Sequence, residues 1–224
     1  MQRLIAPIVL GLAGLSVLLS LGFWQLRRLD WKEGILAEID ARIIDAPVAV
    51  PAVPDRVEDR FLPVTATGEI TDQEINVLVS SQDVGVGFRI ITLFVTEDGR
   101  RLLLDRGIIP ESQKTAERPP VTATVTGNLH WPDEIDFFTP DPDDTANMWF
   151  ARDVDMLSEE LASEPVMIIL RETSEPTPAV TPMPVDTASI PNNHMEYALT
   201  WFGLALVWAG MTAYWIVRIR RDRD

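Results

Sequence analysis

Two uncharged, apolar runs enclose a longer and more polar middle part of the chain. The runs cover residues 4–26 and 197–217, and neither contains Asp, Glu, Lys or Arg. At a rise of 1.5 Å per residue each run forms a helix roughly 30–35 Å long, enough to cross a bilayer core of about 30 Å. We therefore predict an integral membrane protein, with transmembrane helices at 4–26 and 197–217 flanking one extramembrane domain.

The first run is expected to be a permanent anchor and not a cleaved signal peptide. It is longer than the usual apolar core of a signal peptide, and Trp24 and Arg27 stand where small residues would mark a cleavage site. Gly11, Gly14 and Ser16 make one side of this helix thin, which favours close contact with a second helix.

Basic residues predict which side of the membrane each end faces. Four arginines lie within the tail 218–224, and such clusters are typical of cytoplasmic ends. Two spans then place the N-terminus in the cytoplasm too, and the middle domain in the periplasm. Three basic residues after the first run oppose this orientation, but long loops cross largely regardless of charge. They are Arg27, Arg28 and Lys32.

Between the two runs, the spacing of apolar residues changes from four to two. Trp31, Ile35, Ile39 and Ile43 recur every four residues, which predicts an amphipathic helix over 27–46 that continues the first span. Alternating or fully apolar segments follow, and they predict five short strands. These segments are residues 75–80, 88–95, 101–105, 121–128 and 166–171.

Local signals add turns and one helix to this domain. Asp98-Gly99 predicts a hairpin between two of the strands, and Asp153 is the expected N-cap of a short helix over 154–163. We predict that residues 55–171 form a mainly antiparallel β-domain of α+β type, either a small barrel or a sandwich.

Proline and acidic residues mark two further segments. Residues 172–191 contain five prolines, which predicts a stiff extended strap leading to the second span. Residues 133–144 contain six acids, but their spacing is not that of an EF-hand, so we expect a solvated loop.

The composition of the chain and the motifs it lacks exclude several classes of function. The chain has a net charge of −15, which argues against nucleic-acid binding. It has no cysteine, which excludes disulfides, thiolate nucleophiles and cysteine metal sites. No nucleophile elbow, P-loop or dinucleotide motif is present. We expect a protein that is not an enzyme, and a hydrolase using Asp133 and Asp136 is the least favoured alternative.

Two histidines are the candidate ligands. In a helix starting near residue 193, His194, Tyr197 and Trp201 share one face, which places an imidazole above aromatic rings at the outer membrane surface. Imidazole is a common haem ligand, although residue type alone favours an interfacial histidine that binds headgroups or capping groups. His130 follows a strand and is expected to be a surface or turn residue.

Several groups of residues, spread from the first apolar run to the second, resemble the motifs of one protein family. They are 22–32 (GFWQLRRLDWK), 88–92 (FRIIT), 105–107 (DRG), 127–129 (GNL), Trp149, Arg152, Asp153 and 192–202 (NNHMEYALTWF). Together they resemble the surfeit-locus family of cytochrome c oxidase assembly proteins. The most specific of them is the stretch that enters the second span.

This resemblance implies a non-catalytic biogenesis factor for haem-copper cytochrome c oxidase, which would assist haem a delivery or insertion into subunit I. His194 becomes the candidate ligand of the haem iron, with Trp24, Gln25, Tyr197 and Trp201 lining the site. Haem a would be a transient cofactor. The implied partners are oxidase subunit I, other assembly factors and haem a synthase.

The sequence leaves one alternative function open, and its N-terminal residues bear on the expected location of the protein. The alternative function is a cofactor-free, membrane-tethered docking scaffold for oxidase subunits or basic electron carriers. The expected location is the bacterial inner membrane, because no Arg-rich, acid-poor presequence precedes the first run.

Overall fold

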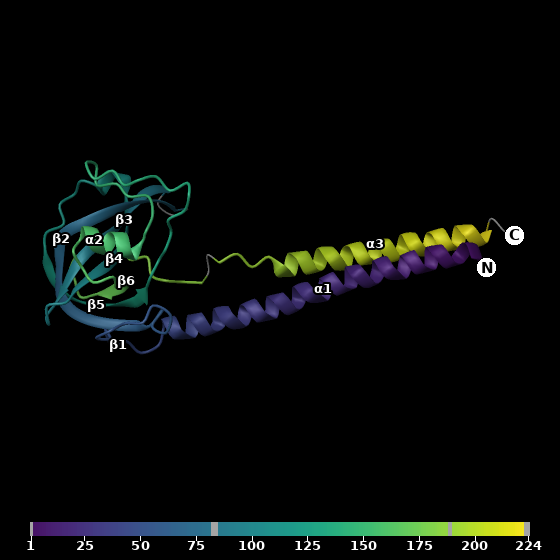
Figure 1. Cartoon of the computed structure of the whole chain (residues 1–224), viewed down its shortest axis with the longest axis horizontal. Helices are drawn as coiled ribbons and strands as arrows, with labels where there is room; N and C mark the ends of the chain where they lie inside the picture. The colour runs from purple at the N-terminus through teal and green to yellow at the C-terminus, as the bar shows by residue number, and fades with distance from the viewer. Residues whose placement is uncertain (1, 82–84, 188–189, 222–224) are drawn as a thin grey trace. The chain divides into compact units, whose positions relative to one another are not determined.

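The computed structural model describes residues 2–81, 85–187 and 190–221. It separates into two compact units. The helical unit consists of Met1–Glu38 with Thr187–Asp224, and the β-domain consists of Ile39–Asp186. Figure 1 shows the strands gathered in the β-domain and two long helices in the helical unit.

Two long helices form most of the helical unit, and the first of them ends within the residues of the β-domain. Helix α1 covers Gln2–Ile43 and helix α3 covers His194–Arg221. Both are long and apolar enough to cross a membrane, with peak mean hydropathies of 2.2 and 1.4. The prediction of two apolar helices flanking a β-domain is therefore confirmed, and the amphipathic segment continues α1 without a break as far as Ile43. Membrane insertion itself stays a prediction.

Small residues let α1 and α3 approach closely. A Cβ added to Gly11 would lie 2.3 Å from Cγ2 of Thr212, and one added to Gly14 would lie 2.5 Å from the Trp208 ring. The indole Nε1 of Trp208 donates a hydrogen bond of 3.0 Å to the Gly11 carbonyl. The thin side expected at Gly11 and Gly14 is thus the side that α3 contacts.

The β-domain is a barrel-like sheet with helix α2 and a 3-10 turn. The strands in the described residues pair in the order β1-β2-β3-β4-β6-β5, and β2 also pairs with β5, which closes the sheet. Their bounds are β1 Val48–Ala49, β2 Pro63–Ser81, β3 Gly85–Thr96, β4 Arg101–Pro110, β5 Val121–His130 and β6 Met167–Thr173. Helix α2 covers Val154–Glu160, and the 3-10 turn covers Glu111–Gln113. The mainly antiparallel prediction is confirmed, with a barrel rather than a sandwich.

Strand β2 is the element that closes the barrel. Its first part, residues 63–70, pairs with β5, and residues 68–81 pair with β3. The register shifts between Ile70 and Glu74, and such an irregularity bends a strand from one pairing into the other. The predicted strand 75–80 is therefore only the second half of β2.

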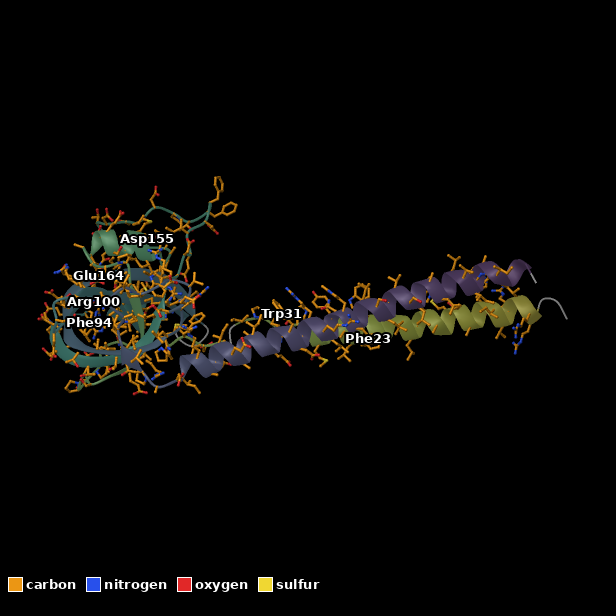
Figure 2. The ribbon with its side chains drawn as sticks, turned by 60° about the horizontal axis from the view of Figure 1, so that its bottom comes forward. Phe23, Trp31, Phe94, Arg100, Asp155 and Glu164 are labelled. Atoms are coloured by element: carbon orange, nitrogen blue, oxygen red, sulfur yellow. The ribbon has the colours of Figure 1, made fainter. Side chains whose placement is uncertain are left out.

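Strands β3, β4 and β6 are buried on both faces, which explains their apolar sequences. Phe94, Leu102 and Leu104 belong to one apolar cluster within the barrel, where Figure 2 labels Phe94. Leu103 belongs to a second cluster that includes Leu157 of α2. Alternate residues of β4 thus enter two different apolar layers.

Two local predictions are confirmed. The hairpin at Asp98-Gly99 joins β3 to β4, with Gly99 at φ +84. The Asp153 side chain accepts a hydrogen bond of 2.8 Å from the backbone N–H of Met156 and so caps α2. Helix α2 ends at Glu160, earlier than the predicted residue 163.

The proline-rich strap is docked on the barrel for part of its length. Residues 172–173 still belong to β6, so the predicted boundary at 172 lies within a strand. Further on, Thr181 pairs with Ile108 of β4 through hydrogen bonds of 2.8 and 3.1 Å. Val180 is buried beside it at 4% exposure.

Candidate functional site

A histidine–glutamine pair joins the two helices at the start of α3. The Nδ1 atom of His194 lies 2.7 Å from Oε1 of Gln25. An amide oxygen only accepts hydrogen bonds, so in this contact Nδ1 is the donor, and in the neutral form of the ring the lone pair is then on Nε2. Gln25 is only 9% exposed, and burial holds its side chain in place.

Further contacts fix the same end of the helix pair. Phe23 and Phe202 pack edge to face with ring centroids 5.3 Å apart, and Figure 2 labels Phe23 on α1. The Nζ atom of Lys32 donates a hydrogen bond to the Pro191 carbonyl, which ties the segment before α3 to α1. Polar and aromatic contacts therefore both position His194.

The other predicted site residues supply aromatic surface but no direct contact. Trp24 and Tyr197 are 55% and 57% exposed, and Trp201 is half-buried. Within the described part of the chain, no hydrogen bond joins any of these three to His194. Of the five predicted residues, the structure brings His194 and Gln25 together.

One further acceptor lies close in sequence to His194. The Oδ1 atom of Asn192 is buried and has no hydrogen-bond partner among the described residues. A buried carbonyl without a partner is costly, and it marks a place where a donor group can bind.

A buried charge cluster in the β-domain is a feature that sequence reasoning missed. Asp105 of β4 is fully buried, and its Oδ2 atom lies 2.5 Å from Nε of Arg89 and 3.2 Å from Nη1 of Arg152. Arg152 also binds Glu134. Burial alone would raise the pKa of Glu134, but the hydrogen bonds and charge of Arg152 outweigh it and hold that pKa below its usual value. The signal in the sequence was the presence of charged residues inside two largely apolar strands, Arg89 in β3 and Asp105 with Arg106 in β4.

His130 does not lie where it was expected. It is the last residue of β5 and is partly buried, with its ring stacked on Phe61 at a centroid distance of 5.1 Å. Its Nδ1 atom is buried and has no partner in the described residues. Burial, and then the nearby charges of Arg60 and Arg152, lower its pKa to about 4. The expectation of a surface or turn residue was wrong, because Phe61 covers the ring.

The acidic pair considered for a hydrolase, Asp133 and Asp136, does not form a buried site. Asp133 and Asp136 are exposed, and Asp136 binds the backbone and side chain of its own loop. No group of three or more His, Asp or Glu side chains is placed to hold a metal ion among the described residues.

Comparison with known proteins gives one consistent result. The family model described as the SURF1 family matches residues 12–206. Surfeit locus protein 1 of Rattus norvegicus is 24% identical over 207 residues, covering 83% of this chain and 67% of that protein. The Xenopus tropicalis protein of the same name is 26% identical over 227 residues, with 90% and 72% covered. The SURF1-like protein of the bacterium Rickettsia felis is 27% identical over 206 residues, with 85% and 88% covered.

Proposed function

The chain belongs to the SURF1 family, and from this membership we propose that it is an assembly factor for haem-copper cytochrome c oxidase. In this proposal it assists the delivery or insertion of haem a into subunit I. The observation that carries the proposal is the family match over residues 12–206, which includes most of α1, the β-domain and residues 194–206 of α3. The resemblance inferred from the residues alone is confirmed at the level of the family.

In this proposal haem a is the cargo of the protein, and His194 is the ligand of its iron. In the neutral form of the ring the Nε2 atom of His194 would be the acceptor, because Nδ1 donates to Oε1 of Gln25, 2.7 Å away. A neutral imidazole nitrogen is a usual axial ligand of haem iron. Trp24, Tyr197 and Trp201 offer aromatic surface that suits a flat apolar ring.

The proposed location is the bacterial inner membrane, with both termini in the cytoplasm and the β-domain in the periplasm. Two apolar helices, the arginines within 218–224 and the resemblance to Rickettsia proteins support this arrangement. The proposed partners are oxidase subunit I, other assembly factors and haem a synthase. The role is non-catalytic, because the proposed site positions cargo and needs no bond-breaking group.

Haem titration of the purified full chain tests the ligand. We expect His194→Ala to weaken haem a binding at least about tenfold, because the iron loses its axial ligand. Gln25→Ala should shift the Soret band and weaken binding less, because Nδ1 loses its acceptor while Nε2 stays available. His130→Gln, which alters the other histidine, is the control and should bind as wild type. An unchanged spectrum and affinity for His194→Ala would remove the ligand assignment.

Charge supports the second candidate, a cofactor-free docking scaffold. Residues 27–196 contain 14 basic and 32 acidic residues, a net charge of −18 that would attract basic proteins. The absorbance spectrum distinguishes the haem-handling function from the docking scaffold. Protein purified from cells that make haem a should show a Soret band only if it carries haem. A colourless preparation, with binding to oxidase precursors that is lost in high salt, would favour the scaffold.

A further inference from the structure

Two adjacent phenylalanines stand almost entirely in water on loop 133–144 of the β-domain. Phe137 is 94% exposed and Phe138 is 85% exposed. Their rings pack edge to face with centroids 5.4 Å apart, so they form one aromatic unit. A single exposed apolar residue is ordinary, but a paired and protruding one marks an interaction site.

Hydrogen bonds within the loop hold this aromatic unit in place. The Oδ1 atom of Asp136 accepts from the backbone N–H of Phe138 at 2.8 Å and from the Thr139 hydroxyl at 3.0 Å. The base of the loop is joined to the β-domain, because the Glu134 backbone N–H donates to the Arg152 carbonyl at 3.1 Å. A loop ordered in advance loses less conformational entropy when it binds.

Other apolar side chains of the loop and of α2 are also exposed. Ile135 and Met156 are 43% and 37% exposed, and both line a shallow cavity of about 90 Å³. Trp149 and Phe150 lie in the same cavity wall. We refer to these exposed side chains of the loop and of the start of α2, Phe137, Phe138, Ile135 and Met156, as the apolar patch.

The charges around the patch distinguish a protein from a lipid surface. Residues 133–144 contain six acids and no Lys or Arg, and five of the acids are exposed and outside the ion pair with Arg152. Aromatic segments that enter anionic membranes normally carry basic residues beside the apolar ones. A carboxylate-rich rim instead complements a protein surface that carries Lys and Arg.

We propose that loop 133–144 is a docking loop, which inserts Phe137 and Phe138 into an apolar socket of a partner protein. Lys and Arg side chains at the rim of that socket would face the carboxylates of the loop. Only the identity of the partner, an oxidase subunit or another assembly factor, rests on the proposed function.

Photocrosslinking in intact cells tests the docking loop. Phe138 is replaced by the photoreactive amino acid p-benzoylphenylalanine in the full chain, and Val53, which is 88% exposed, is replaced in the control. We expect an adduct to a protein from position 138 and none from position 53, with the captured peptide apolar and flanked by Lys or Arg. Asp141→Asn with Asp143→Asn and Asp144→Asn should reduce the yield at least about fivefold.

A second variant checks the role of the rings. With the photoreactive residue at Ile135, Phe137→Ser with Phe138→Ser should lower the adduct yield at least about tenfold, because two buried rings are lost from the contact. Thermal unfolding should stay unchanged, since both rings are exposed in the free protein.

Three results would overturn the docking loop. The first is a lipid adduct, or no adduct, from position 138. The second is an equal yield of protein adducts from positions 138 and 53. The third is an adduct yield that does not change with the charge substitutions or with the ring substitutions. A charge-dependent adduct to a protein unrelated to the oxidase or its assembly would support the docking loop and count against the proposed function instead.

Discussion

Asp105 is a buried carboxylate that two arginines share, and it has no contact with solvent. Removing one partner from a buried ion pair leaves uncompensated charge, which costs about 3–5 kcal/mol. We predict that Asp105→Ala lowers the free energy of unfolding of the β-domain by that amount, because Arg89 and Arg152 lose their shared acceptor.

The matched control is an exposed pair of the same residue types. The Oδ1 atom of Asp155 lies 2.5 Å from Nη2 of Arg56, but the Asp155 side chain is 60% exposed. Asp155→Ala should therefore lower the free energy of unfolding by no more than about 1 kcal/mol. Urea unfolding of the full chain in micelles, followed by the circular dichroism of the strands, measures both values. Equal losses in the two variants would contradict a structural role for the buried cluster.

His130 gives a prediction about pH. Its pKa of about 4 in the folded state lies below the ordinary value of 6.5, so the unfolded state binds more protons between these two values. The contribution of His130 to stability is therefore complete above about pH 6.5 and is lost as the pH falls toward 4. In a His194→Ala chain His130 is the sole histidine, and NMR of its ring should show a titration near pH 4. A midpoint between 6 and 7 would mean that Phe61 does not cover the ring.

Single residues of the candidate site were predictable only in part. His194 stood out because it lies just before the second apolar run, whereas Gln25 was named only through the family resemblance. The partners of Asp105 did not stand out, because Arg89 lies on another strand and Arg152 lies in a loop. Only the pairing of β3 with β4 brings Arg89 and Asp105 together, and the register of that pairing cannot be predicted from either strand alone.

At the scale of elements, local signals predicted well and long-range pairings did not. The Asp153 cap and the Asp98-Gly99 hairpin follow from a few neighbouring residues, and both are present. The first half of β2 was missed, because residues 63–70 are a strand only through their pairing with β5. The parallel pairing of β4 with β6 also depends on residues far apart in the sequence.

The contact between the proline-rich strap and β4 leads to a prediction for Gly107. This glycine has φ +115, and a Cβ added to it would lie 2.0 Å from the Thr181 carbonyl oxygen. Gly107→Ala combines backbone strain with a clash, so we expect a loss of more than about 2 kcal/mol in unfolding free energy. Gly99→Ala is the control, because Gly99 has φ +84 and open space around it, and should cost about 1 kcal/mol. Chemical denaturation compares them, and equal costs would mean that the strap does not pack against β4.

At the scale of the whole molecule, charge and hydropathy are separated along the chain. The acidic residues are concentrated in 27–196, while the runs 4–26 and 197–217 of the two helices that could cross a membrane carry no charge. This separation was fully visible in the sequence, because it depends on composition and length alone. The closed barrel was not, since closure needs the pairing of β2 with β5.

The central claim is that this chain helps load haem a into oxidase subunit I, and the content of the oxidase measures it most directly. The gene is deleted in the source organism, and the strain is complemented with wild type, with His194→Ala or with the control His130→Gln, at matched protein levels. Haem a and copper are then measured per subunit I in the oxidase that remains. We predict that haem a per subunit I falls on deletion and is restored by wild type and His130→Gln but not by His194→Ala. Full haem a content in the deletion strain would contradict the claim.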